Sequence, residues 1–510
     1  MRALLWRRCG THYLETTCRR PFSRSHANPG RVNVAQLLSQ RAEASDVDVH
    51  GWVRSVRRQK RVAFAAVGDG STLEPLQAVL TPDDAAELST GAAVRLTGSW
   101  QASKGQGQSH ELAVTRVKLL GENDAEHNPL QPKYQTPEYL RTIPHLRPRI
   151  PANALLLRLR SQVIASLTHF FNDAGFVQTH TPIITSSDCE GAGEVFTVSS
   201  NAAKDLAQKT KPANDAQVEH FFRTPKYLTV SAQLHLEALA QAVDKVWTLS
   251  PTFRAERSDT PRHLSEFYML EAELCFIHDV REVMDVVEAM LRTVAKDLLG
   301  SRTASELLSA RETMQAEQEA AFSGPVASEL KRRWEGMAEG AWPRVTYTDA
   351  IEILQQAAAD AATTFEHQPT YEHGLQAEHE RYLAATLGAG LRPVFVTHYP
   401  RAQKAFYMSP SPGGDDGRDT AACFDLLVPD LCELAGGSMR EHRAAELRAA
   451  MEAKGVAGAE LDWYLDLRKY GGVPHGGFGL GFDRLLCYLS GPGNVRDVVA
   501  FPRWVGRCEC

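Results

Sequence analysis

Short runs of alternating apolar and polar residues dominate the chain from Val32 to about Glu122. The runs are DVDVHGWVRSV, RVAFAAVGDGS, PLQAVL, AAVRLTGSW and HELAVTRVKLLG, and Gly-rich turns separate them. Alternation with a period of two is typical of strands that bury one face. Five such strands predict a small β-barrel of the OB type over residues 31–122.

The pattern changes to a helical period after a proline-rich stretch. Repeated prolines in residues 123–150 predict an interdomain linker. Apolar residues then recur at helical spacing until the polar stretch from Asn172 to Gly175 ends the helix, namely Leu156, Leu159, Val163, Leu167 and Phe170. A strand ending at Thr181 and Pro182 follows. Strands and helices alternate from there to the C-terminus, so residues 151–510 predict a second, α+β domain.

Two polar stretches interrupt the second domain. Residues 199–218 and 300–340 are rich in Ala, Glu and Lys. Because this composition is polar, we expect both stretches to be surface insertions.

A charged turn separates two apolar runs in the middle of the chain. The stretch FRAERSDTPRHLSEF, residues 253–267, lies between VWTL and YML, which predicts an antiparallel hairpin. Arg254 and Glu256 are two residues apart, so both side chains lie on one face of a strand. They could bind a phosphate and an amine in one cleft. A cross-strand ion pair on an exposed face is the alternative.

The C-terminal segment HGGFGLGFDRLLCYLSG suggests a second phosphate-binding group. Its glycines allow close approach to a ligand, and Arg484 lies in the first turn of the predicted helix, at the positive end of the helix dipole. Too little chain follows Gly481 for a dinucleotide-binding βαβ unit. Asp425 and Glu433 flank a short turn nearby in the sequence. Two carboxylates beside phosphate-binding arginines indicate Mg²⁺, although each acid alone could be a solvated surface charge.

Composition narrows the class of protein. The chain has 510 residues, is 43% hydrophobic and 23% charged, and contains no apolar run near the ~18 residues of a membrane helix. We therefore expect a globular protein that does not span a membrane. The nine cysteines include no CxxC pair, which favours scattered reduced thiols over a zinc site.

The first thirty residues differ from the rest of the chain. They contain six Arg and one acid, which is typical of a mitochondrial transit peptide and predicts a location in the mitochondrial matrix. Loss of this leader would leave the chain more acidic than its net charge of −6. A nucleic acid would then be bound by a local basic patch such as RSVRRQKR, residues 54–61.

Three segments together resemble the motifs of class II aminoacyl-tRNA synthetases. FVQTHTPIIT, with Pro182, is similar to the first motif; FRAE and HLSEF to the second; and GFGLGFDRLL to the third. The OB barrel narrows the resemblance to the subclass for Asp, Asn and Lys. VSAQLHLEAL, ELAGGSMREHR, LRKYGGVPHGGFGLGFDRL and NVRDVVAFPR are most similar to asparaginyl-tRNA synthetases, and the leader indicates a mitochondrial form.

The resemblance implies an ATP site. Arg254 would bridge the substrate carboxylate and the α-phosphate, and Arg484 would clamp the γ-phosphate, so these two arginines are the expected catalytic residues. Glu256 would accept from the adenine amine, and His263 would approach the terminal phosphates. Phe267 would stack on adenine. Mg²⁺ would bind to Asp425 and Glu433. No protein nucleophile is needed, which excludes a role of that kind for His475 and Cys423.

The resemblance also implies an asparagine site. Glu190 and Gln233 would hold the α-ammonium group, with Glu271 beneath them, while Glu237 and Arg440 would bind the side-chain amide. In aspartyl enzymes the segment matching SAQLHL ends in a Lys that pairs with the substrate carboxylate; here Leu236 stands at that position.

Two further contacts follow from the resemblance. Phe64 would stack on an anticodon base of tRNA(Asn) and Gln77 would read the central uridine; the alternatives are a barrel-core position for Phe64 and an exposed strand position for Gln77. The helix at 155–171 and the Pro182 strand would form a homodimer, unless the helix belongs only to the protein's own core. Two other functions stay open: an aspartyl-tRNA synthetase, and a catalytically inactive paralogue that binds nucleic acid.

Overall fold

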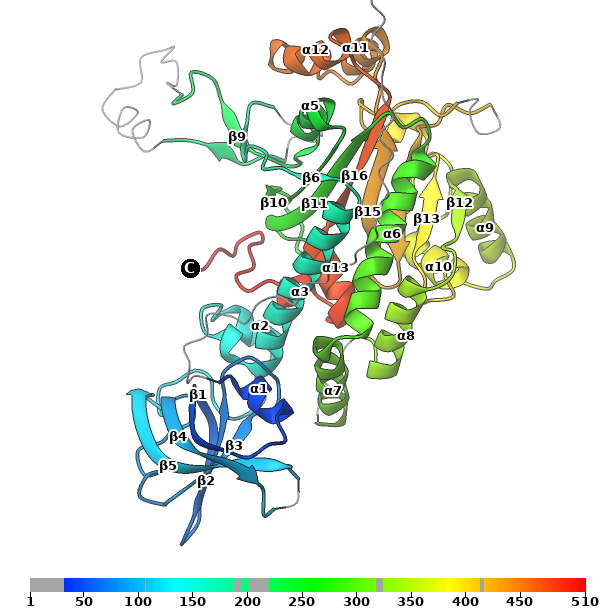
Figure 1. Ribbon diagram of the computed structural model, residues 1–510. Coiled ribbons are helices and arrows are strands. Elements are labelled where there is room, and N and C mark those ends of the chain that lie inside the picture. The colour runs from blue at the N-terminus through cyan, green and yellow to red at the C-terminus, as the bar shows by residue number, and fades with distance from the viewer. Residues whose placement is uncertain (1–31, 106, 188–193, 201–219, 318–323, 413–416) are drawn as a thin grey trace, which may run out of the picture. The chain divides into compact units, whose positions relative to one another are not determined.

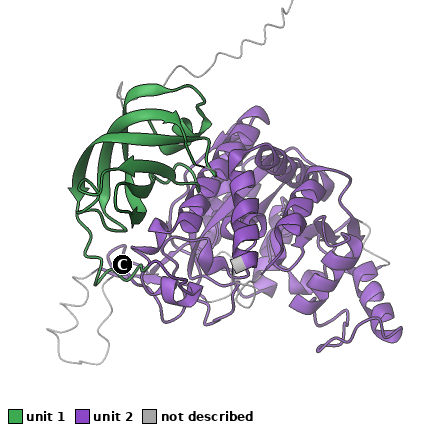
Figure 2. Ribbon diagram, turned by 90° about the horizontal axis from the view of Figure 1, so that it is seen from below, with its two compact units in different colours: residues 1–131 green, residues 132–510 purple. Residues whose placement is uncertain are grey.

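The computed structural model describes residues 32–105, 107–187, 194–200, 220–317, 324–412 and 417–510. The chain divides into two compact units, Met1–Gln131 and Pro132–Cys510 (Figure 2). Three of the expectations above, the leader at 1–30, Glu190 and most of the insertion at 199–218, lie outside the described residues. No helix in the described part of the chain is both long and apolar enough to cross a membrane.

The first unit is a closed five-stranded barrel, as the alternating pattern predicted. Its strands are β1 (Ala44–Arg58), β2 (Ala63–Gly68), β3 (Leu76–Leu80), β4 (Ala93–Ala102) and β5 (His110–Gly121), paired in the order β1-β2-β3-β5-β4. Alternate residues of each strand fill the barrel; in β2 and β3 these are Ala63, Ala65, Val67, Leu76, Ala78 and Leu80. A short helix, α1 (Val34–Ser39), begins at a capping box formed by Asn33 and Gln36.

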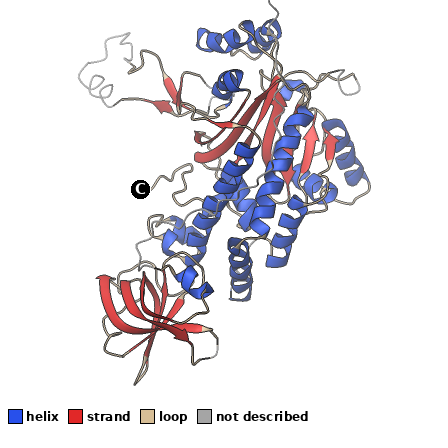
Figure 3. Cartoon of the chain, in the orientation of Figure 1, coloured by secondary structure: helices blue, strands red, loops and turns tan. Residues whose placement is uncertain are grey.

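The second unit is built on one large sheet (Figure 3). Eight strands pair in the order β12-β13-β14-β15-β16-β11-β10-β6, and all neighbouring pairs are antiparallel except β12 with β13 and β10 with β6. The bounds are β6 (Val177–Gln178), β10 (Lys245–Phe253), β11 (Glu266–Cys275), β12 (Arg344–Thr346), β13 (Val394–Thr397), β14 (Cys423–Val428), β15 (Cys432–Met439) and β16 (His475–Gly481). The fold is therefore α+β, with an antiparallel core sheet, as the sequence predicted.

The predicted hairpin and the predicted long helix are both present. β10 and β11 pair from Lys245 opposite Leu274 to Phe253 opposite Glu266, so the charged turn projects from one end of the pair. The helix α3 (Pro151–Asp173) buries one stripe of residues against α6 (Val280–Leu299) and the sheet, and the two helices lie side by side in Figure 1. The stripe comprises Leu155, Leu159, Val163, Leu167 and Phe171.

The stretch at 300–340 is not merely a surface insertion, which corrects the sequence-based expectation. It forms α7 (Arg302–Glu317) and α8 (Ala327–Ala338). Leu330, Trp334 and Met337 of α8 are fully buried in the main core. Their spacing follows one face of a helix, and the many charged residues between them hid this stripe in the sequence.

The remaining elements of the second unit surround the sheet. They are α2 (Pro137–Arg141), η1 (Arg147–Arg149), β7 (Ile184–Thr185), β8 (Thr197–Val198), β9 (Lys226–Leu228), α5 (Gln233–Val243), α9 (Tyr347–Ala359), α10 (Ala377–Leu387), η3 (Arg401–Gln403), α11 (Ala444–Ala453), η4 (Ala459–Leu461), α12 (Asp462–Lys469), α13 (Phe482–Ser490) and η5 (Val495–Asp497). Two of these helices matter for the site below, because α5 packs on β10 and β11 and α12 contacts α5.

Candidate active site

The charged turn of the β10–β11 hairpin forms one wall of a cavity of about 120 Å³. All five residues expected to bind ATP line this cavity: Arg254, Glu256, His263, Phe267 and Arg484. The Arg254 guanidinium carbon lies 5.6 Å from the Phe267 ring centroid. Side chains from the turn, from β11 and from α13 thus converge on one space, as the sequence predicted from separate segments.

Hydrogen bonds within the turn fix the orientation of His263. The Nδ1 atom lies 2.6 Å from the Thr260 hydroxyl oxygen and 3.0 Å from that of Ser258, while Nε2 lies 3.3 Å from a Glu256 carboxylate oxygen. Burial lowers the pKa of His263, and the nearby Glu256 opposes that shift. Both ring nitrogens of His263 therefore face polar groups of the turn, which holds His263 and Glu256 together on the cavity wall.

Arg484 is positioned by the start of α13. The helix begins at Phe482, and the Arg484 Nη1 atom donates to the backbone carbonyl of Glu433 at 3.0 Å. Asp483 ties the same turn to its surroundings by accepting from Arg160 at 2.6 Å and from the Tyr268 amide at 2.8 Å. The guanidinium is thereby held on rigid secondary structure, which suits a phosphate-binding group.

A second cavity, of about 210 Å³, adjoins the first. The two share Arg254, Met269, Glu433 and Gly479 in their linings. The second is lined further by Ser231, Gln233, Leu236, Glu271, Ala272, Glu273, Lys404, Tyr407, Met408, Asp425, Gly436, Gly437, Arg440 and Phe478. Arg254 therefore stands where a ligand in one cavity would meet a ligand in the other.

Two glutamates of β11 point into the second cavity. Glu271 and Glu273 are two residues apart on the strand and are both buried. Glu271 accepts from the Ser231 hydroxyl at 2.5 Å and from the Ala232 amide at 2.9 Å. Burial raises the pKa of Glu271, and these hydrogen bonds oppose the shift. A Cβ at Gly477, which pairs with Glu273 across the sheet, would overlap the Glu273 carboxylate, so the glycine is required there.

Glu273 forms a buried ion pair with Arg440. Nε of Arg440 donates to one Glu273 oxygen at 3.2 Å and Nη2 donates to the other at 3.1 Å. Nη1 donates to the Ser438 hydroxyl at 2.8 Å. Burial raises the pKa of Glu273, while the Arg440 charge acts against that shift. The sequence-based reasoning included Arg440 but missed Glu273, although the alternation of Glu271 and Glu273 in EAELC was a signal for it.

Glu237, expected to touch the amino acid, lies behind the cavity. It is fully buried and does not belong to the lining. Its oxygens accept from four side chains, namely Gln233 at 3.0 Å, Tyr464 at 2.8 Å, Arg468 at 2.6 Å and His475 at 3.0 Å. Both carboxylate oxygens are thus already bound within the protein. We therefore revise the expected direct contact: Glu273 is the carboxylate that faces the cavity beside Arg440.

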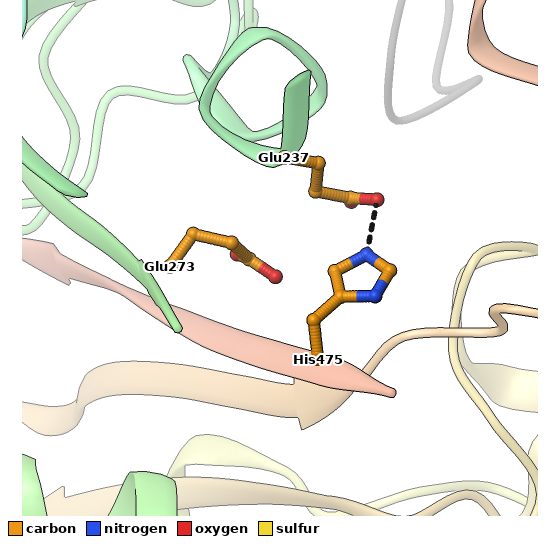
Figure 4. Close-up of side chains that lie close together, drawn as sticks. All are labelled: Glu237, Glu273 and His475. Carbon is orange, nitrogen blue, oxygen red and sulfur yellow. Dashed lines mark hydrogen bonds and ion pairs between the residues drawn. The ribbon is translucent and has the colours of Figure 1, made fainter. Parts of the chain in front are cut away.

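Glu237, Glu273 and His475 gather closely enough to suggest a metal site (Figure 4). They are the only such group of three among the residues that the structure describes. Arg468 and Arg440 already bind the carboxylate oxygens of Glu237 and Glu273, at 2.6 and 3.1 Å. Two guanidinium groups at these distances leave no room for a cation, so we assign no metal there.

Asp425 and Glu433 form the more suitable cation site. A Cβ placed on Gly436 would lie 3.2 Å from Asp425 Oδ1 and 3.4 Å from Glu433 Oε1, so the two carboxylates border one small space. Lys404 donates to the other Asp425 oxygen at 2.7 Å. Burial, and then the charges of Glu433 and Asp425, raise the pKa of Glu380 to about 7. Oxygen ligands in a negative field beside the phosphate cavity fit Mg²⁺.

The two barrel residues lie on the outer face of the first unit. Phe64 pairs with Val79 across β2 and β3, Gln77 pairs with Ala66, and all four alternate with core residues. The Arg57 guanidinium lies 5.2 Å from the Phe64 ring centroid. Gln77 donates weakly to Glu111 at 3.4 Å. Phe64 is therefore not part of the barrel core. Within the basic patch at residues 54–61, however, Arg58 donates hydrogen bonds to the backbone carbonyls of Ala85, Ala86 and Leu88.

Comparison with known proteins gives a consistent result. Residues 137–505 match the family model for class II tRNA synthetases (D, K and N), and residues 47–120 match that for the OB-fold nucleic acid binding domain. The chain is 42% identical to the mitochondrial asparagine–tRNA ligase of Saccharomyces cerevisiae, over 90% of this chain and 92% of that protein. It is 39% identical to the asparaginyl-tRNA synthetase of Homo sapiens, over 96% of each.

A solved structure shows the same arrangement. The asparaginyl-tRNA synthetase of Pyrococcus horikoshii, complexed with asparaginyl-adenylate, matches with a TM-score of 0.75 at 28% identity, covering 91% of this chain and 96% of that one. A putative aspartyl-tRNA synthetase from Leishmania major shares the fold, with a TM-score of 0.72 at 21% identity.

Proposed function

This chain belongs to the class II tRNA synthetases for aspartate, lysine and asparagine, and we propose that it is the asparagine–tRNA ligase of mitochondrial translation. It activates L-asparagine with ATP to the aminoacyl adenylate and transfers the asparaginyl group to the 3′ end of tRNA(Asn). The observation that carries the choice of amino acid is the Arg440–Glu273 ion pair on the cavity wall.

That ion pair offers a hydrogen-bonding partner to each of the two polar groups of a carboxamide. The Arg440 guanidinium offers further N–H donors to the amide oxygen, and Glu273 offers an acceptor to the amide NH₂. Aspartate would set a second carboxylate against Glu273. Leu236 lines the same cavity at the position where the aspartyl enzymes carry a Lys, so this site lacks that cation. These features favour asparagine over the aspartyl alternative.

Asparagine and ATP would meet at Arg254. With the α-ammonium group held by Gln233 and Glu271, the asparagine carboxylate points from the second cavity toward Arg254, which also lines the ATP cavity. A carboxylate oxygen attacks the α-phosphorus, the bond from phosphorus to the bridging oxygen breaks, and pyrophosphate leaves. Arg254 stabilises the charge that develops on the α-phosphate, while Arg484 and His263 hold the leaving phosphates.

Asp425 and Glu433 would hold Mg²⁺, which supplies neutralising charge for the phosphates when bound. The 3′-terminal ribose hydroxyl of the tRNA then attacks the carbonyl carbon of the adenylate, and AMP leaves. We assign the anticodon contact to the outer face of the barrel: Phe64 offers a half-buried ring for stacking and Gln77 an amide for base recognition.

A homodimer is also part of the proposal. Apolar residues on α3 and on the strand after Pro182 remain exposed in the described chain: Leu157 is 44% exposed, Ile183 40% and Ile184 43%. Such residues indicate burial against a partner of the same kind. Sedimentation at micromolar concentration should give twice the monomer mass, and a monomeric mass would contradict this assembly.

The activity is tested by ATP–pyrophosphate exchange with each of the twenty amino acids. Asparagine should support exchange and aspartate should not. Exchange with aspartate alone would favour the aspartyl alternative. Exchange with none would favour the inactive paralogue, which the presence of Arg254 and Arg484 in one cavity argues against. Import of the full chain into isolated mitochondria, with removal of the leader, tests the location in the matrix.

A further inference from the structure

A histidine lies behind the amino-acid cavity and faces Glu237. His475 is the first residue of β16 and is fully buried. Figure 4 shows its ring directed at the Glu237 carboxylate, and the Glu273 side chain lies beside both residues. His475 does not belong to the cavity lining, so a role for it must act through other residues.

The hydrogen bonds of His475 determine its protonation state. Nδ1 lies 2.7 Å from the backbone carbonyl oxygen of Val473, which can only accept. Nε2 lies 3.0 Å from a Glu237 carboxylate oxygen. Burial alone would raise the pKa of Glu237, but the charge of Arg468 holds it below the usual range, so Glu237 can only accept. Both ring nitrogens therefore face acceptors, and only a doubly protonated ring can donate to both.

The groups around this imidazolium come from four elements. Titratable or charged side chains near His475 are Glu237 of α5, Tyr464 and Arg468 of α12, Glu273 and Cys275 of β11, and Arg440 and His442 of the loop after β15. Among them, Glu237 and Glu273 are the two acids, and each has its own cationic partner at hydrogen-bond distance.

The position of Arg440 shows what the imidazolium does. Arg440 Nε lies 3.9 Å from Glu237, beyond hydrogen-bond distance, yet Arg440 makes three hydrogen bonds to Glu273. The Glu237 carboxylate already binds Arg468 and His475, which balance its negative charge, so it does not attract Arg440 away from Glu273. A neutral ring would turn a lone pair either to the Val473 carbonyl or to Glu237, and Glu237 would then compete with Glu273 for Arg440.

We propose that His475, held as an imidazolium, is a positioning residue that satisfies Glu237 so that Arg440 and Glu273 stay paired on the cavity wall, where they discriminate asparagine from aspartate. The proposal rests on the function proposed above. A charged His475 would also act on Glu273 directly, because its charge lowers the pKa of Glu273 whereas Glu237 raises it. An ionised Glu273 repels aspartate, and a protonated one could donate to it.

The first test measures the proton count directly. The protein is labelled with ¹⁵N at histidine, ring resonances are recorded near neutral pH, and the His475 signal is assigned by its loss in His475→Gln. Both ring nitrogens of His475 should carry hydrogen. A ring with hydrogen on only one nitrogen overturns the proposal, whatever the variant's activity.

The second test measures discrimination. His475→Gln keeps a donor near Glu237 but removes the charge, so Glu237 should compete with Glu273 for Arg440. The ratio of kcat/KM for asparagine over aspartate should then fall at least about 10-fold, the change expected when Arg440 loses one hydrogen bond to the charged Glu273. The KM for ATP should stay near the wild-type value. Tyr464→Phe, which removes a neutral donor to Glu237, should change the ratio less, and His442→Gln, the same substitution at a neighbouring histidine, should not change it.

The outcomes are distinct. A folded His475→Gln protein with wild-type discrimination overturns the proposal, and so does a Tyr464→Phe protein whose ratio falls as far. If His475→Gln does not fold, the His475 signal is assigned instead as the ring resonance that shifts in Tyr464→Phe, because Tyr464 and His475 bind the same Glu237 oxygen. A single hydrogen-bearing nitrogen in that ring would again overturn the proposal. If the wild type shows no preference for asparagine, the proposed function fails, while the ring nitrogens still report the charge of His475.

Discussion

Replacement of Glu273 by glutamine tests the reading of the amino-acid site. In the native protein Glu273 faces the cavity with three hydrogen bonds from Arg440 at 3.1 to 3.4 Å. Glu273→Gln keeps the size of the side chain, removes its charge and leaves an amide that can either donate or accept. We expect the variant to lose most of its preference for asparagine over aspartate.

The magnitude follows from the geometry of the shared guanidinium. An aspartate side chain bound to Arg440 would place its carboxylate about 4–5 Å from that of Glu273, where two unit charges repel by about 3–4 kcal/mol at an effective dielectric constant near 20. Removal of that repulsion alone changes the ratio of kcat/KM by at least about 10²-fold. Asparagine should also lose about 1.5 kcal/mol or more, because its NH₂ no longer donates to a charged acceptor.

The assay is ATP–pyrophosphate exchange with asparagine and with aspartate, each over a full concentration range. Glu271→Gln is the matched control, since it makes the same change two residues along the same strand, at the group that holds the α-ammonium common to both substrates. It should weaken both substrates alike and leave the ratio near that of the wild type. An unchanged ratio in Glu273→Gln, with an unchanged melting temperature, would refute the role of Glu273.

Three further predictions concern other parts of the site. Arg484→Ala should abolish adenylate formation while melting temperature and tRNA binding stay near wild type, and retained exchange would contradict its contact with the γ-phosphate. Discrimination against aspartate should weaken as pH falls, because burial raises the pKa of Glu273 and protonation removes the repulsion; a ratio of kcat/KM that stays constant across an acidic pH series would contradict this. Buried Arg496 donates to the Thr260 carbonyl at 3.1 Å and pairs with Asp259 at 2.9 Å, so it anchors the turn that carries His263. Arg496→Ala should therefore raise the KM for ATP by roughly 10-fold. An equal rise in the KM for asparagine would indicate a general loss of structure instead.

The elements that could be predicted from the sequence are those with a clear period. Alternation in the first unit predicted five strands and a barrel, and the spacing of Leu159, Val163 and Leu167 predicted α3. The region of α8 was misread because its apolar residues are few. Trp334 is fully buried, yet Arg333 beside it is charged and buried too, held by Glu329 and Asp430 at 2.6 and 2.5 Å.

The site could be predicted in outline but not in depth. Motif spacing brought the ATP-binding residues to one cavity, because they lie on neighbouring strands and on the helix that follows. It did not distinguish Glu237 from Glu273 as the acid that faces the ligand. Gln233 and Glu237 lie one turn apart on α5, so both share a face, but only the packing of α12 on α5 shows that Glu237 is covered by Tyr464 and Arg468.

The buried charges behind the cavity are better explained by selectivity than by stability. Burying an ion pair costs solvation that the pairing seldom exceeds, so an apolar cluster of the same volume would generally serve the fold as well. Here Glu237, Glu273, Arg440 and Arg468 are all buried, and all except Glu273, which binds Arg440, have more than one partner. Because Ser438 also binds Arg440, the network holds Arg440 and Glu273 in a single orientation. An acceptor and a donor fixed side by side in that way fit a carboxamide and exclude a carboxylate of the same shape, which a flexible polar pocket could not do.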